Sequence, residues 1–129
     1  MNKVILMGRL ARDPELKTVG DGISMARFTV AVNRRFAKEN AEQKADFINC
    51  TAWRKTGEFI AKYFKKGSMI AVAGELQART WEDDTGQKRY ATEVNVSEAY
   101  FTGEKSGTVN KSNDSDLQGF EELSANEDD

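Results

Sequence analysis

Two residue types that carry much of enzyme chemistry are scarce, since the 129-residue chain has no histidine and one cysteine, Cys50. A lone cysteine forms no disulfide within the chain, and without histidine neither a Cys/His zinc site nor a histidine-based catalytic triad can be built. No hydrophobic run approaches the roughly 20 residues that a membrane span needs, and Gly8 and Arg9 come too early for a signal peptide. The chain is therefore expected to be cytoplasmic and non-enzymatic, with no metal and no cofactor.

Charge is unevenly distributed along the chain. Its 19 basic and 21 acidic residues give a net charge of −2, but residues 106–129 carry −6 and residues 1–105 carry +4. A basic body is compatible with a nucleic-acid partner. The polar composition of residues 104–119 predicts disorder. We therefore expect one folded domain over residues 1–103 and a disordered acidic tail over residues 104–129.

Five segments rich in β-branched and aromatic residues, separated by turn-forming clusters, predict five strands. They are residues 3–10, 24–33, 46–54, 68–81 and 88–101. Residues 83–86, Asp-Asp-Thr-Gly, are expected to form a hairpin tip rather than a metal site.

A short helix is expected between the third and fourth predicted strands, with Thr56 as its cap and Gly67 at its end. Four apolar residues share one helical face, which we assign to the core: Phe59, Ile60, Tyr63 and Phe64. This order of elements predicts an all-β fold, a five-stranded Greek-key OB barrel whose open end the helix closes.

Alternation along the third predicted strand separates two kinds of residue. Ile48, Cys50 and Ala52 share one face, which forms a credible core, so Cys50 is expected to be buried and inert. The opposite face combines large aromatic with polar side chains: Phe47, Asn49, Thr51 and Trp53. Such a face suits a flat and polar ligand such as a nucleobase, although any one of these aromatics could instead pack in the core.

The fourth predicted strand is sorted in the same way, with Ile70, Val72, Gly74 and Leu76 toward the core. Cations adjoin aromatics at three places: Arg34-Arg35 before Phe36, Arg54-Lys55 after Trp53, and Arg79 before Trp81. Interleaved cations and aromatics are typical of a groove that binds a single nucleic-acid strand, although Phe36 alone is undecided between core and groove. The candidate phosphate contacts are Arg9, Arg34, Arg35, Arg54, Lys55, Lys62, Arg79, Lys88 and Arg89.

Seven blocks of sequence resemble the bacterial single-stranded DNA-binding proteins, over about residues 1–102. They are NKVILMGRL (2–10), RDPEL (12–16), FTVAV (28–32), DFINC (46–50), WRK (53–55), YFKKGS (63–68) and YATEV (90–94). The resemblance implies an OB fold, assembled as a homotetramer, that binds single-stranded DNA without sequence preference in replication, recombination and repair. It also implies a nucleoid-associated location, and base-stacking positions at Phe36, Phe47, Trp53 and Trp81.

The family's acidic tail typically ends in an Asp-Pro-Phe-like or Leu-Pro-Phe-like tip that docks on replication and repair proteins. This sequence ends at Asn126-Glu127-Asp128-Asp129, so the tip is either absent or lies beyond the printed residues, and partner recruitment is left open. The residues of the tail that could bind a partner are Phe120, Leu123, Glu127, Asp128 and Asp129.

Three other functions are weighed against this interpretation. An RNA-binding or tRNA-binding OB domain would use similar aromatics and cations but would read 2′-hydroxyls or base edges. A nuclease would need a carboxylate cluster or an activated nucleophile, and neither pattern is evident. A replication-restart paralogue of the same fold is disfavoured by the acidic tail. Separately, residues 4–7 are apolar on both faces of the first strand, so either the helix or a loop covers them or they form a contact between protomers.

Overall fold

The computed structural model describes residues 1–36, 38–40 and 42–103, and the predicted acidic tail lies outside them. The described residues form six strands and one helix. In chain order these are β1 (Val4–Leu10), β2 (Glu15–Val19), β3 (Ile23–Asn33), β4 (Ala45–Trp53), α1 (Arg54–Tyr63), β5 (Met69–Glu82) and β6 (Lys88–Phe101). Among these residues, no helix has the length and apolar character needed to cross a membrane.

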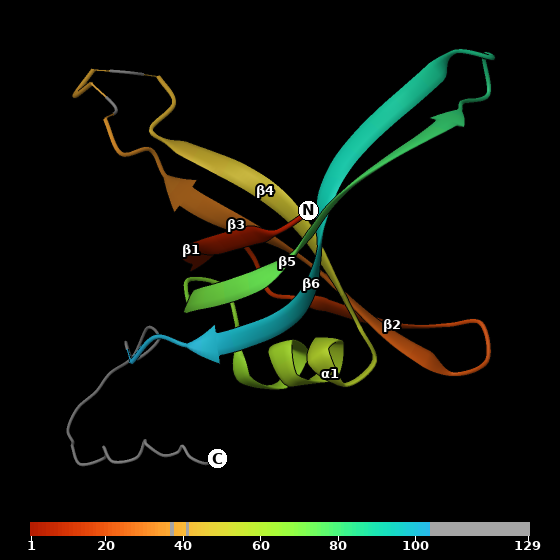
Figure 1. Ribbon diagram of the computed structural model, residues 1–129, viewed down its shortest axis with the longest axis horizontal. Helices are drawn as coiled ribbons and strands as arrows, with labels where there is room; N and C mark the ends of the chain where they lie inside the picture. The colour runs from red at the N-terminus through yellow and green to blue at the C-terminus, as the bar shows by residue number, and fades with distance from the viewer. Residues whose placement is uncertain (37, 41, 104–129) are drawn as a thin grey trace.

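All six strands belong to one sheet that closes on itself. The strand order is β1-β5-β6-β4-β3-β2, and β1 also pairs with β3, so five strands form a closed ring (Figure 1). The helix α1 lies at one end of this ring and packs against β3 and β4 (Figure 1). This arrangement confirms the predicted closed sheet of five strands with a helix between the third and fourth of them.

The sixth strand, β2, was not expected from the sequence. It pairs only with β3, from Glu15 opposite Arg27 to Val19 opposite Ile23, and the two form a ribbon that extends from the ring (Figure 1). Four of its five residues are exposed, so no buried face produces the alternation on which strand prediction depends.

The helix begins and ends at other residues than predicted. It starts directly where β4 ends, with Trp53 in the N-cap position and no side-chain cap, whereas the Thr56 hydroxyl faces the carbonyl oxygen of Ser97 at 3.5 Å. The helix thus continues directly from the strand, and no side chain caps its first turn. At the other end the last helical residue is Tyr63.

Gly67, the predicted end of the helix, lies in the turn that follows it. Its φ of 88° is readily adopted only by glycine, and its N–H donates to the carbonyl oxygen of Leu10 at 2.9 Å. The turn thus anchors the end of β1 rather than the end of α1.

The interior of the ring is mainly aliphatic, with Phe28 among its buried residues. Its largest fully buried side chains are Leu10, Ile60, Ile70, Val30, Val72, Val94 and Cys50. The predicted core assignments of Ile70, Val72, Cys50 and Ala52 are confirmed, and Phe64 is also buried. Two assignments were wrong: Tyr63 is about half exposed at the end of α1, and so is Leu76.

Leu76 is exposed because β5 leaves the ring just before it. The pairing of β5 with β1 ends at Gly74, and past Leu76 and its partner Val94, where β6 also leaves β4, the two strands continue as a two-stranded arm (Figure 1). The register between the strands shifts next to Gly74, where Ser97 is the extra residue on β6. The arm ends with Glu82 opposite Lys88, so the hairpin tip falls at the predicted residues.

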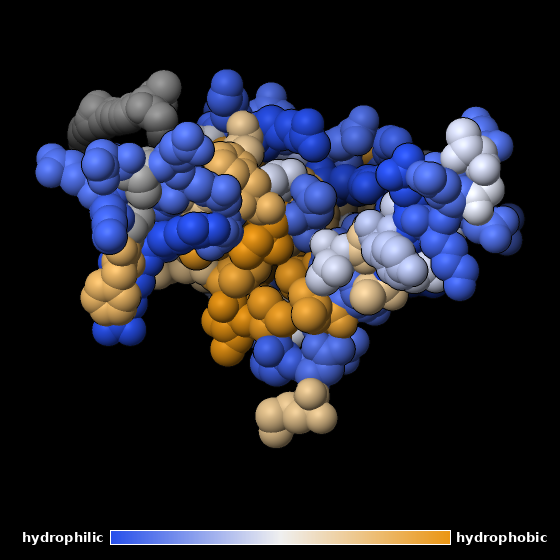
Figure 2. Space-filling model, turned by 90° about the horizontal axis from the view of Figure 1, so that it is seen from above, coloured by the Kyte–Doolittle hydropathy of each residue, from blue (hydrophilic) through white to orange (hydrophobic). Residues whose placement is uncertain are grey.

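The outer face of β1 is apolar. Ile5 is 73% exposed and Met7 60% exposed, and their register partners on β5 are Ala73 and Ala71. Figure 2 shows an apolar area at the centre of the face seen from above, bordered by hydrophilic surface. Within the described part of the chain, neither the helix nor a loop covers Ile5 or Met7, which leaves the protomer contact as the prediction for this face.

The reactivity of Cys50 tests which residues of β4 point into the ring and which point outward. Burial, and to a lesser degree the charge of Glu93, raises the pKa of its thiol to about 12, so almost no thiolate forms near pH 8. We expect native protein to resist iodoacetamide at pH 8 and to react once it is unfolded in urea, as followed by mass spectrometry. An Asn49→Cys, Cys50→Ala variant should react in the native state, and rapid native labelling of Cys50 would contradict the assigned faces.

Candidate nucleic-acid interface

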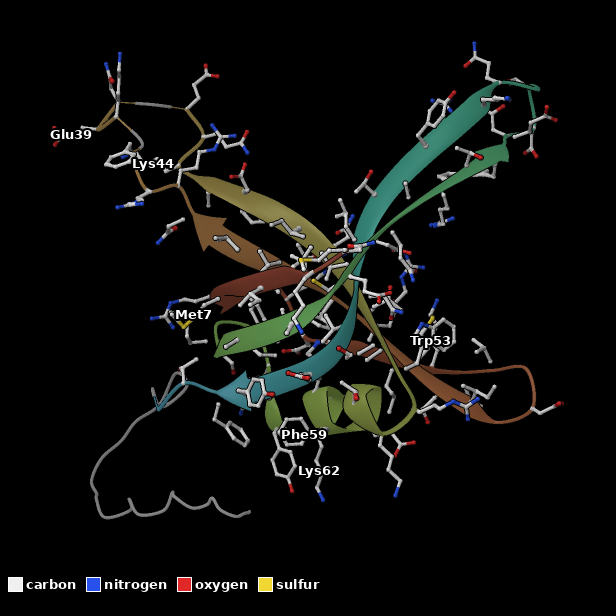
Figure 3. All side chains as sticks on the ribbon, viewed as in Figure 1. Met7, Glu39, Lys44, Trp53, Phe59 and Lys62 are labelled. Atoms are coloured by element: carbon white, nitrogen blue, oxygen red, sulfur yellow. The ribbon has the colours of Figure 1, made fainter. Side chains whose placement is uncertain are left out.

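The outward face of β4 has an aromatic side chain near each end and polar side chains between them. Phe47 is 63% exposed and Trp53 41% exposed. Their register partners on β3 are small or flexible, Ala31 beside Phe47 and Met25 beside Trp53, so neither ring is covered by the neighbouring strand. Trp53 lies by the β2–β3 ribbon, whereas Lys62 extends below α1 (Figure 3).

The arm adds a third exposed ring beside a cation. Trp81 is 42% exposed, and the guanidinium carbon of Arg79 lies 4.7 Å from the centre of its ring. Arg79 also approaches the Glu93 carboxylate at 3.6 Å. Because Gln77 pairs with Glu93 and Trp81 with Arg89, alternation places all of these side chains on one face of the arm.

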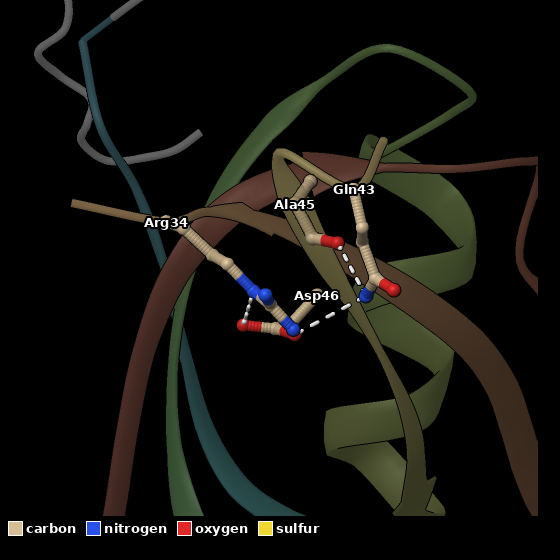
Figure 4. A network of polar contacts seen from close by, with 4 residues as sticks. All are labelled: Arg34, Gln43, Ala45 and Asp46. Atoms are coloured by element: carbon tan, nitrogen blue, oxygen red, sulfur yellow. Dashed lines mark hydrogen bonds and ion pairs between the residues drawn. The ribbon is translucent and has the colours of Figure 1, made fainter. Parts of the chain in front are cut away.

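Phe36 is the most exposed of the four predicted stacking residues, at 85%. The guanidinium carbon of Arg35 lies 5.1 Å from its ring centre. Its loop is held at the base by Arg34, whose Nη2 donates to the Asp46 carboxylate at 2.8 Å (Figure 4). The hydrogen bond from Arg34 lowers the pKa of Asp46, and the same bond raises the pKa of Arg34.

Gln43 completes this network from the other side of the loop. Its side-chain amide donates to the carbonyl oxygen of Ala45 at 2.9 Å and to Asp46 at 3.3 Å (Figure 4). The loop that carries Phe36 is therefore tied to β4 at both of its ends.

A hollow of about 480 Å³ lies in the middle of the outer face. Its lining includes Thr29 and Asn49, which are register partners on β3 and β4, and Glu93 of β6. Arg12, from the loop before β2, and Arg27 of β3 also line it. The hollow is thus polar and contains two cations, and it adjoins the arm through Glu93.

Aromatic rings on one face, guanidinium groups beside two of them and a polar hollow between them form a surface suited to a charged chain with flat bases. A family model described as the single-strand binding protein family matches residues 1–102. The chain belongs to this family.

Three relatives show how far the likeness to other members of the single-strand binding protein family extends. Single-stranded DNA-binding protein 2 of Listeria monocytogenes is 46% identical over 109 residues, covering 84% of this chain and 68% of its own length. The single-stranded DNA-binding protein of Bacillus cereus is 46% identical over 117 residues, covering 86% and 69%. Single-stranded DNA-binding protein A of Bacillus subtilis is 45% identical over 107 residues, covering 83% and 62%.

The predicted phosphate contacts do not all lie together. Arg9 on β1 is in register with Ala31, which is in turn in register with Phe47, so it shares their outward row. Lys88, opposite Glu82, falls on the face of the arm away from Trp81. Five other candidates already contact side chains of the protein: Arg34 contacts Asp46, Arg35 the ring of Phe36, Lys62 the ring of Tyr63, Arg79 both Trp81 and Glu93, and Arg89 Asp83.

Arg54 occupies an unusual backbone position for a phosphate contact. Its φ is 58°, the left-handed region that non-glycine residues rarely adopt. This conformation lets the chain turn from β4 into α1 within one residue, between the exposed Trp53 and the exposed Lys55. Strain of this kind is characteristic of binding sites.

Two cations at the interface, Arg12 and Arg27, were missed by the sequence analysis. Neither is adjacent in sequence to an aromatic that was assigned to the groove, which was the signal used. The alternation of β3 could have found Arg27, because it falls on the same face as Thr29, but Arg12 comes from a loop and no pattern in the sequence points to it.

Asp83 holds the hairpin tip together. One carboxylate oxygen accepts hydrogen bonds from the Thr85 hydroxyl at 2.6 Å and from the N–H groups of Thr85 and Gln87 at 2.9 and 3.0 Å. The other accepts from Arg89 Nε at 2.8 Å. These donors, the Thr85 hydroxyl first among them, lower the pKa of Asp83 to about 2.

We therefore predict an acid-labile hairpin tip. Because the folded-state pKa is depressed, the contribution of Asp83 to stability is present above its unfolded pKa of about 4 and is lost as the pH falls through about 2. The measurement is a titration of the Asp83 carboxyl carbon by NMR. Thr85→Val should raise the midpoint, and an unchanged midpoint in that variant would show that the hydroxyl is not the main cause.

Proposed function

We propose that this chain binds single-stranded DNA without sequence preference, by stacking bases on Phe36, Phe47, Trp53 and Trp81 and neutralising phosphates with the adjacent cations. The observation that carries this proposal is the exposure of all four aromatic side chains, with guanidinium groups over the rings of Phe36 and Trp81. An exposed ring leaves apolar area in water, and a base that stacks on it removes that area from water again. Every base has a stackable face, so stacking does not select a sequence.

The biological setting follows from the family. Its members are DNA-binding proteins, and the Listeria and Bacillus relatives are named for binding single-stranded DNA. We propose that the chain protects single strands exposed during replication, recombination and repair, in the cytoplasm at the nucleoid. The role is one of binding, with no catalytic step.

The opposite net charges of the two parts of the chain support different roles for them. We propose that residues 1–103 bind DNA, and that residues 104–129 compete weakly with it for the basic side chains because residues 106–129 carry −6. Recruitment of replication and repair proteins through the tail, at Phe120, Leu123 and the terminal acids, is part of the same proposal.

Trp81 provides the test of stacking. We expect Trp81→Ala to weaken binding to oligo-dT by about 1–3 kcal/mol, the range found when a base-stacking ring is removed. Fluorescence anisotropy of labelled oligo-dT measures the affinity, and quenching of tryptophan fluorescence on binding reports the contact directly.

Tyr90 supplies a matched control for Trp81. It is an exposed ring on the same arm, but its register partner is Thr80, so alternation places it on the opposite face. Tyr90→Ala should leave the affinity close to that of the unmodified protein. Equal losses in the two variants, or none in a folded Trp81→Ala protein, would contradict stacking on this face of the arm.

We further propose that the outer face of β1 joins copies of the chain into a homotetramer. The side chains of Ile5 and Met7 on this strand are apolar and exposed. Their register partners on β5 are alanines, which are small enough to permit close approach of a second copy. Tyr100, opposite Ala71 on β6, widens the same face, and its hydroxyl donates to the Glu98 carboxylate at 2.6 Å.

The assembly is tested by charge substitution on β1. Ile5→Lys with Met7→Lys should convert tetramers into smaller species at micromolar concentration, because burying two ammonium groups in an apolar contact is unfavourable. Analytical ultracentrifugation measures the mass, and Leu76→Lys, an exposed apolar residue on the arm, is the control. A monomeric unmodified protein would contradict the proposal outright.

A further inference from the structure

The hollow on the outer face lies between the two aromatic side chains of β4. Asn49, one of its lining residues, is two residues from Phe47 and four from Trp53 along the same outward face. A strand that stacks on both rings therefore passes over it. Its volume of about 480 Å³ falls in the range of sites that enclose small ligands, which is enough for one nucleotide.

The carboxylates around the hollow are mostly engaged with the protein. Asp13 accepts a hydrogen bond from the N–H of Lys66 at 2.8 Å. Glu93 pairs with Arg79 at 3.6 Å and accepts from the Thr51 hydroxyl at 3.5 Å. Glu15 is thus the one lining carboxylate with no such contact to another described residue.

The two arginines of the hollow are unengaged. Neither Arg12 nor Arg27 forms a hydrogen bond or ion pair with any residue that the structure describes, and both are exposed. Every other arginine singled out at the interface, except Arg54, already contacts a side chain or a carbonyl group. Two guanidinium groups that line one hollow and have N–H donors without a partner among the described residues suit an anion such as a phosphate.

Asn49 adds a neutral hydrogen-bond donor. Its Oδ1 accepts from the Thr29 hydroxyl at 3.1 Å, which leaves both N–H donors of Nδ2 without a partner among the described residues. Each of the four bases has at least one acceptor on its edge, so a single amide donor in the hollow can serve any of them. Such a contact adds affinity without imposing a sequence.

We propose that this hollow is a subsite for one nucleotide of the bound strand, with Arg12 and Arg27 holding its phosphate and the Asn49 amide donating to the edge of its base. The subsite rests on the proposed function, because the nucleotide belongs to a strand held by the aromatic side chains. It assigns a DNA-binding role to three residues at which neither an exposed ring nor a ring–cation contact is present.

The phosphate contact is tested in the full chain with Arg12→Ala/Arg27→Ala. Losing one phosphate contact should lower the magnitude of the slope of log K against log salt by about 0.7. Losing charged hydrogen bonds should also weaken oligo-dT binding about tenfold. The control is Lys3→Ala/Lys65→Ala, which removes two exposed cations that do not line the hollow and should change neither quantity.

The base contact is tested with a second ligand. Asn49→Ala should weaken binding to oligo-dT but not to an abasic oligomer of the same length, whereas the double arginine variant should weaken binding to both. Equal behaviour of the arginine variant and the lysine control would overturn the phosphate assignment, and an equal effect of Asn49→Ala on both oligomers would overturn the base assignment. Failure of the unmodified protein to bind oligo-dT would instead overturn the proposed function, which these two outcomes leave intact.

Discussion

Closure of the ring at β1 is the constraint on which the binding face depends. β1 pairs with β5 from Val4 to Arg9 but with β3 only at its last two residues, Arg9 and Leu10. At Gly8 a Cβ atom would lie 2.3 Å from the carbonyl oxygen of Ala31, so this position tolerates no side chain. The buried Leu10 then fixes the end of the strand through backbone bonds to the turn after α1.

A ring closed this tightly determines where large aromatic residues can go. Its interior is filled mainly by aliphatic side chains, together with Cys50 and the rings of Phe28 and Phe64, and inserting a further ring into such packing would cost about 1–3 kcal/mol. The aromatics of β4 therefore lie on the outer face, where the free protein leaves them exposed to water. The same alternation that protects the core thus creates the stacking surface, and the arm extends that surface past the bulge at Ser97.

The sequence was sufficient wherever burial on one face of a strand produced a pattern. Alternation along β4 placed Phe47 and Trp53 on the face opposite Cys50, and the turn-forming residues 83–86 located the hairpin tip. Prediction from sequence failed where no such pattern exists or where the backbone follows contacts between distant segments. The strand β2 has no buried face, Leu76 lies where β5 leaves the ring, and the helix starts without the predicted Thr56 cap. The hollow could not be predicted for the same reason, because its lining comes from a loop and four strands that only the register of the sheet brings together.

Several of the interface arginines are held in place by the protein's own acids. Arg34, Arg79 and Arg89 pair with Asp46, Glu93 and Asp83 while remaining about half exposed. An exposed ion pair of this kind contributes little to stability because water screens both charges, so exchanging the carboxylate for a phosphate costs little, yet the pair restrains the guanidinium before DNA arrives. Such an arginine brings a carboxylate with it, so it neutralises less of the charge of the strand and releases fewer of the cations condensed on the DNA. The salt dependence of binding should therefore reflect cations without a carboxylate partner, such as Arg12 and Arg27, more strongly than these three.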